Sequence, residues 1–117
     1  MKQTETDLMR TLEEIAPLYQ MELFRNNVGF AWMGKSERRG KTVVIHNARP
    51  VRFGLCKGSS DLIGWKRRGD SAIFTAVETK IGKAKTTKEQ DDFLDLVNRS
   101  GGIGIVARDP KDLADIE

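Results

Sequence analysis

The most informative segment of the chain is Ser71-Ala72-Ile73-Phe74-Thr75-Ala76-Val77-Glu78-Thr79-Lys80. Its first part is largely apolar, as expected of a central strand that is covered on both faces of a sheet. Its last residues carry charge, with Glu78 and Lys80 two positions apart. Because side chains alternate along a strand, these two should leave the same face while Thr79 points away. The segment therefore predicts a buried strand that brings an acid and a base to one edge of a sheet.

On the N-terminal side, residues 61–65 predict a short strand and residues 67–70 a turn, so that residues 61–80 form a β-hairpin. Residues 21–28 predict a first strand, and residues 42–46 and 51–55 predict two short strands around a break at 47–50. We expect residues 35–40 to be a polar, mobile loop. Residues 4–19 predict an amphipathic helix that Thr4 can cap. Its apolar stripe, at spacings of three and four, is Leu8, Leu12, Ile15 and Tyr19.

On the C-terminal side, residues 82–86 predict a basic loop, and Thr87 can cap a helix that ends at Gly101-Gly102. The apolar residues expected on its buried side are Phe93, Leu94, Leu96 and Val97. Residues 103–107 predict a final buried strand, reached by a parallel crossover, and Asp109-Pro110 opens a short terminal helix. The order predicts an α/β fold in which a helix, three or more strands, a helix and a strand form a single domain over residues 1–117.

The composition is typical of a water-soluble globular domain, with 38% hydrophobic and 32% charged residues. No apolar run approaches the ~20 residues that span a bilayer, and the N-terminus lacks a secretion signal. We therefore expect no membrane partner and a cytoplasmic location, which is the host cytoplasm if the chain is virus-encoded. One cysteine, Cys56, and one histidine, His46, cannot build a Cys/His zinc site, so any metal ion must be bound by oxygen atoms. We expect Cys56 to be a half-buried, small apolar residue.

The net charge of +3 and the pI of 9.2 favour polyanionic partners. The basic residues form three clusters: Lys35, Arg38, Arg39 and Lys41; Lys57, Lys66, Arg67 and Arg68; and Lys83, Lys85 and Lys88. The first cluster is equally compatible with a solvated loop. The third cluster follows Glu78 closely, and we predict that its lysines contact nucleic-acid phosphates without reading the sequence.

The predicted hairpin can bring the carboxylates of Asp61 and Glu78 together at one sheet edge. With the backbone carbonyl of Thr79, they offer the oxygen ligands that Mg²⁺ or Mn²⁺ prefers, and such an ion can activate water against a phosphodiester. We expect Lys80 to orient the water or to stabilise the charged phosphate, with a role as general base as the alternative. Charged residues at strand ends are also common on solvated surfaces. The buried strand, the hairpin partner and the following helix together favour the site.

Three strings carry a family resemblance: Gly58-Ser59-Ser60-Asp61-Leu62-Ile63-Gly64-Trp65, then Val77-Glu78-Thr79-Lys80, then Thr87-Lys88-Glu89-Gln90. They resemble the virus-type replication-repair nuclease (VRR-NUC) domain of the PD-(D/E)xK superfamily, and the likeness spans nearly the whole chain. It implies a restriction-endonuclease-like αβββαβ core with a mixed central sheet flanked by helices. Ser60 departs from the family, which often has proline before the aspartate. This departure concerns the geometry of the loop and leaves the carboxylates intact.

The resemblance places the motif aspartate at Asp61, the Glu-x-Lys pair at Glu78 and Lys80, and a helix glutamine at Gln90. It implies that Glu5 is an additional metal or water ligand, although an acid at a helix N-terminus also compensates the helix dipole.

Arg25 and Asn26 lie in a string that resembles the family's strand before the Gly29 turn. This likeness implies that they contact the scissile strand or brace the acid of the first helix.

The resemblance implies a metal-dependent endodeoxyribonuclease that acts in DNA repair and is encoded by phages among others. It implies DNA as the partner and no organic cofactor. Branched DNA such as a Holliday junction is the implied substrate, and a homodimer is a further expectation because junction resolvases work on two strands. Two alternatives stay open. One is a nucleic-acid-binding module of the same fold without catalysis, and the other is a different small α/β protein, for protein or RNA binding, whose acids are structural.

Overall fold

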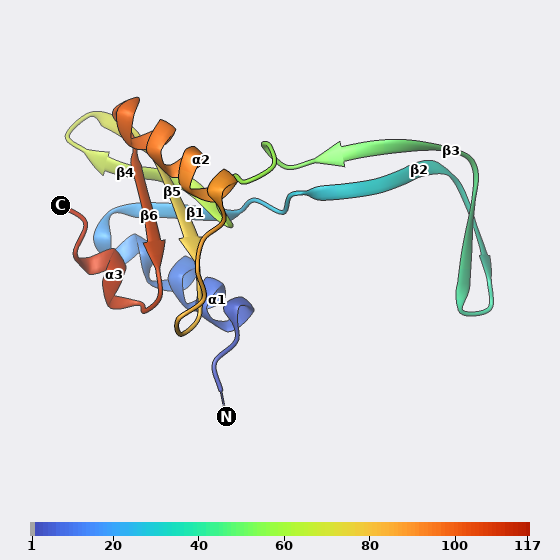
Figure 1. Ribbon diagram of the computed structural model, residues 1–117, viewed down its shortest axis with the longest axis horizontal. Coiled ribbons are helices and arrows are strands. Elements are labelled where there is room, and N and C mark those ends of the chain that lie inside the picture. Colours follow the sequence, from blue (N-terminus) through green and yellow to red (C-terminus); the bar gives the residue numbers. More distant parts are fainter. Residues whose placement is uncertain (1) are drawn as a thin grey trace.

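The computed structural model describes residues 2–117, and Figure 1 shows a body of packed helices and strands from which one long hairpin projects. In chain order the elements are α1 (Glu5–Ile15), the 3₁₀ helix η1 (Ala16–Tyr19), β1 (Met21–Arg25), β2 (Gly29–Arg39), β3 (Thr42–Phe53), β4 (Leu62–Arg68), β5 (Ser71–Thr79), α2 (Lys88–Arg99), β6 (Ile103–Ala107) and α3 (Lys111–Ala114).

The body is built on a four-stranded mixed sheet in the order β1-β4-β5-β6. Strand β4 pairs antiparallel with both β1 and β5, which confirms the predicted hairpin. Strand β6 runs parallel to β5 after the crossover through α2, as predicted. Strand β5 therefore lies in the interior of the sheet, and its residues 75–77 are paired on both edges.

Helix α1 covers one face of the sheet. Thr4 caps it, accepting a hydrogen bond from the backbone N–H of Asp7, whose side chain accepts one in return from the backbone of Thr4. Leu8 and Leu12 are fully buried and pack in one cluster with residues of the sheet, including Val77. The predicted helix is shorter than expected because the chain changes to a 3₁₀ turn at Ala16, beside a proline that cannot donate a backbone hydrogen bond.

Helix α2 covers the opposite face. Leu94 and Val97 are buried against Ala76, the neighbour of Val77, so consecutive residues of β5 serve the two faces. Leu96 was expected on the buried side of this helix, but 51% of it is exposed. None of the helices formed by residues 2–117 has the length and apolar character needed to cross a membrane.

The long hairpin corrects three sequence-based expectations. Residues 35–40 are not a mobile loop, and residues 47–50 do not separate two short strands but belong to one long strand. Instead β2 and β3 pair antiparallel from Gly29 opposite Phe53 to Arg39 opposite Thr42 and form a separate two-stranded sheet. A polar sequence is stable as a strand here because cross-strand pairing satisfies its backbone. The element order thus has two more strands than the αβββαβ pattern. Cys56, just beyond the hairpin, is exposed rather than half-buried.

Gly64 makes the close pairing of β1 and β4 possible, and this gives a test of the sheet. A Cβ atom at this position would lie 1.8 Å from the carbonyl oxygen of Glu22 on β1. We expect Gly64→Ala to lower the free energy of unfolding by about 3 kcal/mol in urea titrations, because backbone atoms would have to move apart. The exposed Ser71→Ala on the same hairpin is the control. Equal stability of Gly64→Ala and wild type would contradict this packing of β1 on β4.

Candidate active site

Asp61 and Glu78 meet where β4 begins and β5 ends. Leu62 and Val77 are the last pair at this end of the β4–β5 hairpin. Asp61 directly precedes this pair in the chain, and Glu78 directly follows it. The Oδ2 atom of Asp61 accepts hydrogen bonds from the backbone N of Thr79 (3.0 Å) and from its hydroxyl Oγ1 (2.7 Å). The side chain of Thr79 therefore holds Asp61 in place, a contact that the alternation of side chains along the strand did not indicate.

The carboxyl group of Glu78 is buried, with only 2% of the residue exposed. This burial, together with the nearby negative charge of Asp61 and a smaller contribution from Glu5, raises the pKa of Glu78 to about 8. The charge of Lys80 acts in the opposite direction. Without a cation close to these acids, Glu78 therefore holds its proton at neutral pH.

The two oxygens of Glu78 have different surroundings. Oε1 accepts a hydrogen bond from Nε2 of Gln90 at 3.1 Å. Oε2 is buried and has no hydrogen-bond partner among the described residues. A buried polar atom without a partner is costly, and a divalent cation between Oε2 and the carboxylate of Asp61 would remove that cost. The donor set, made of oxygens only, fits a hard ion such as Mg²⁺ or Mn²⁺.

Gln90 links the site to the start of α2. Its Oε1 accepts from the backbone N of Thr87 at 2.9 Å, and the Thr87 hydroxyl accepts from the backbone N of Gln90 at 3.2 Å. The same side chain thus caps the helix and donates to Glu78. The predicted helix cap is confirmed, and it fixes Gln90 at the acid.

Asn26 organises the loop that carries Asp61. Its Nδ2 donates to the hydroxyl of Ser59 (2.8 Å) and to the carbonyl of Ser60 (2.9 Å), and its Oδ1 accepts from the backbone N of Leu55 (3.2 Å). Its own backbone N donates to the carbonyl of Asp61 at 2.8 Å. These contacts support the loop in the absence of a proline at position 60. The residues next to Asn26 in the sequence do not indicate that it positions this loop, because Ser59 and Ser60 are more than 30 positions away.

Three other predicted residues lie around this centre. Lys80 follows β5, is half-buried, and donates its backbone N–H to the carbonyl of Ala107 at 3.1 Å. Glu5 is exposed at the first position of α1, and no three side chains of His, Cys, Asp or Glu converge on one point within residues 2–117. Glu5 therefore stands apart from the carboxylate pair. Arg25 pairs with Glu13 at 2.8 Å rather than with Glu5.

A mainly polar hollow of about 320 Å³ opens beside Asp61. Its lining residues are Met9, Asn26, Asn27, Val28, Gly58, Ser59, Asp61 and Gln90. The hollow gives one carboxylate of the pair and the glutamine access to a ligand that approaches from the base of the long hairpin.

The basic residues near the site differ in their surroundings. Lys83 and Lys85 are exposed on the loop between β5 and α2, and Lys88 forms an exposed pair with Asp92 at 2.8 Å. Lys66, from the second basic cluster, is instead buried and donates to the carbonyl of Tyr19 at 3.0 Å. Lys66 therefore belongs to the packing of the body.

The family model of the VRR-NUC domain matches residues 5–109 of the chain. The match begins at Glu5 and includes Asp61, Glu78, Lys80 and Gln90. No curated protein shows significant similarity to the chain.

The raised pKa of Glu78 predicts a pH-dependent stability. The folded chain retains a proton that the unfolded chain releases above the ordinary pKa of 4.5, so this contribution to stability is complete below 4.5 and is lost as the pH rises through about 8. In chelator, we expect Glu78→Gln to become progressively more stable relative to wild type over this range, as measured by urea unfolding. The matched control is Asp70→Asn, in the turn at the other end of the β4–β5 hairpin. A constant difference between Glu78→Gln and wild type would show that Glu78 is not held protonated.

Proposed function

The chain belongs to the VRR-NUC family, and on this premise we propose that it is a divalent-metal-dependent DNA endonuclease centred on Asp61, Glu78 and Lys80. The observation that carries the proposal is the buried Oε2 of Glu78, which has no hydrogen-bond partner in the described part of the chain and lies beside an Asp61 that Thr79 already fixes. A purely structural acid in such a position would be expected to have a donor for each oxygen.

The proposed ligands are the carboxylates of Asp61 and Glu78 and the backbone carbonyl of Thr79, with Mg²⁺ or Mn²⁺ as the ion. When bound there, the ion would supply a Lewis acid for the phosphate and lower the pKa of an attacking water. We include Glu5 as a more distant acid, because its negative charge contributes to the raised pKa of Glu78.

The remaining side chains prepare the site for this chemistry. Glu78 must release its proton before its carboxylate can bind a cation, so cation affinity should rise with pH. Gln90 keeps one oxygen of Glu78 in place, and the hydroxyl of Thr79 does the same for Asp61. The ammonium group of Lys80 is proposed to stabilise the negative charge that develops on the phosphate.

DNA is the proposed substrate, with Lys83, Lys85 and Lys88 as phosphate contacts on the rim of the site. Arg25, partly exposed beside Glu13, is a proposed contact to the cleaved strand. For Asn26 we propose a positioning role in place of a DNA contact, because its amide group is engaged in holding the Asp61 loop. Branched DNA such as a four-way junction is the substrate class that the family likeness favours.

Cleavage assays on supercoiled plasmid and labelled four-way junctions, with Mg²⁺, Mn²⁺ or chelator, test the proposal. We expect cation-dependent cleavage, and a loss of at least about 100-fold in Asp61→Asn, Glu78→Gln and Lys80→Met, because each removes a charge that acts in the transition state. All three should still fold and bind DNA, and Asp70→Asn should cleave as wild type does.

Cleavage that persists in all three variants would reject this site. Wild-type protein that binds DNA but does not cleave it with either ion would favour the non-catalytic binding module.

The lysines on the loop after β5 generate a separate prediction about binding. We expect Lys83→Ala combined with Lys85→Ala to weaken DNA binding for all sequences and to reduce the slope of log Kd against log salt by about 2, one for each lost phosphate contact. Fluorescence anisotropy over a range of salt concentrations measures the slope. Arg99→Ala, at the far end of α2, is the control for simple loss of charge. An unchanged slope in the double variant would place both lysines outside the DNA contact.

A further inference from the structure

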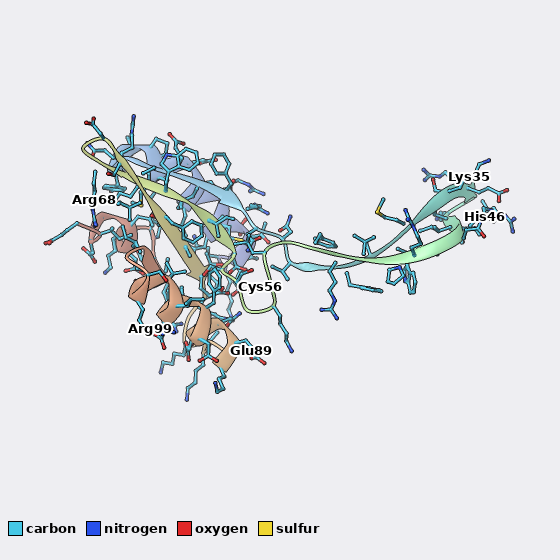
Figure 2. The ribbon with its side chains drawn as sticks, turned by 90° about the horizontal axis from the view of Figure 1, so that it is seen from above. Lys35, His46, Cys56, Arg68, Glu89 and Arg99 are labelled. Carbon is cyan, nitrogen blue, oxygen red and sulfur yellow. The ribbon has the colours of Figure 1, made fainter. Side chains whose placement is uncertain are left out.

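A hollow of about 540 Å³ lies where the hairpin of β2 and β3, residues 29–53, leaves the body; this hairpin is called the arm below. Figure 2 shows the labelled Cys56, one of the lining residues, near this junction, and Lys35 and His46 toward the far end of the arm. Sites for small molecules typically have volumes of about 300–1,000 Å³. The hollow is therefore large enough for a ligand of the size of a nucleotide.

Aromatic and aliphatic side chains form much of the wall. Phe30 and Phe53 come from the two strands of the arm, and Val28 and Leu55 lie beside the ends of these strands. The ring of Phe53 packs on the backbone of Gly29, where a Cβ atom would lie only 2.5 Å from its Cζ. Yet 55% of Phe30 and 44% of Phe53 are exposed. The two phenylalanines therefore offer apolar surface to a ligand from a supported position.

Both charged residues of the wall are cations. Arg52 stands opposite Phe30 in the ladder of the arm, and Lys57 lies just beyond the arm. None of the ion pairs formed within residues 2–117 involves Arg52, and Lys57 pairs with Glu89 only at 3.8 Å, on the surface. The wall thus combines aromatic rings with positive charge, which suits an anion that carries a flat, apolar group.

The backbone at the base of the arm keeps this wall in shape. Residues 29–33 pair regularly with residues 49–53, and the bulge that shifts the register, and with it which side chains share a face, lies farther out, after Met33. Gly54 has a φ of 87°, and a Cβ atom there would lie 2.7 Å from the Cα of Val28. The two chain segments that enclose the hollow are therefore in direct backbone contact.

The hollow adjoins the polar one that opens beside Asp61. Val28 lines both, and Lys57 of the first is followed directly in the chain by Gly58 and Ser59 of the second. A DNA strand with one phosphate at Asp61 can therefore place a neighbouring nucleotide past Val28, at the base of the arm.

We propose that this hollow binds an unpaired base of the DNA substrate, next to the phosphate that is cleaved. The inference rests on the proposed nuclease function and adds a substrate class to it, namely DNA with an unpaired nucleotide beside the cut. The base stacks on Phe30 and Phe53, and its phosphate pairs with Arg52. A base inside a duplex must first be unstacked and unpaired, and this cost is least for a base that has no partner. A purely apolar ligand would leave Arg52 without an anion.

Two DNA duplexes of the same sequence test the docking of the base. One carries a single bulged adenine and the other an abasic bulge, so that both have the same interrupted backbone and only one has the base. In chelator, where no cleavage occurs, we expect the wild type to bind the bulged adenine at least about fivefold more tightly in fluorescence anisotropy, because stacking on aromatic rings contributes to affinity.

The ratio of the two dissociation constants identifies the residues that hold the base. Phe30→Ala and Phe53→Ala should each bring this ratio close to 1, whereas Phe53→Trp should keep it, because the larger ring still stacks. The matched control is Phe74→Ala, a phenylalanine of the body that is 43% exposed, which should keep the wild-type ratio. A general loss of folded protein weakens the binding of both DNAs and leaves the ratio unchanged.

Arg52 has a different expected effect. The phosphate that it binds is present in both DNAs, so Arg52→Ala should weaken the binding of both by a similar factor and leave the ratio unchanged. Unchanged affinity for both DNAs would overturn the assignment of the phosphate to Arg52.

Cys56 reports where the base docks, because it is the single cysteine of the chain, is exposed and lines the hollow. With saturating DNA in chelator, we expect the bulged adenine to slow alkylation of this thiol by iodoacetamide several-fold more than the abasic bulge does. Mass spectrometry of the intact chain measures the rate. Equal protection by the two DNAs would overturn the location of the base.

Equal affinity of the wild type for the two DNAs, or a preference that survives both Phe30→Ala and Phe53→Ala, would overturn the proposal. These outcomes are separate from catalysis. Cleavage without the preference would reject the base site alone, and the preference without cleavage by either ion would reject the nuclease function alone.

Discussion

Strand β5 is paired on both edges, with β4 and β6, and is covered on one face by α1 and on the other by α2. Glu78, near the end of this strand, is only 2% exposed. This enclosure, together with the charge of Asp61, raises the pKa of Glu78 to about 8, and Oε2 of Glu78 finds no hydrogen-bond partner within residues 2–117. The electrostatic character of the site thus follows from the packing of the sheet, because water that would stabilise the ionised carboxylate is excluded.

The acids are held by groups that also hold the fold together. Gln90 caps α2 and donates to Glu78, Thr79 is the last residue of β5 and binds Asp61, and Asn26 links β1 to the Asp61 loop. A side chain with two such partners has little freedom, which keeps the carboxylates in a fixed arrangement before any ligand arrives. Fixed oxygen ligands suit catalysis because no reorganisation is needed during the reaction.

In the arm, residues 29–53, apolar side chains are exposed and not packed in a core. The body buries Leu8, Leu12 and Val77 between helices and sheet, whereas the arm leaves Phe30, Trp32 and Val43 largely exposed. It also carries the excess positive charge of the chain, and the acids remain with the body.

The amino-acid sequence by itself determined the body and most of its site. The apolar run that ends in Glu78 and Lys80, the turn at Gly69, and the caps Thr4 and Thr87 are local signals, and each depends on residues that are close together in the chain. They predicted the β4–β5 hairpin, the parallel β6 and the pairing of Asp61 with Glu78. Tertiary structure alone decided the contact of Thr79 with Asp61, the role of Asn26 and the shape of the arm. These depend on hydrogen bonds between distant segments and on a bulge that sets which side chains share a face, and neither is encoded in the spacing of residues along one strand.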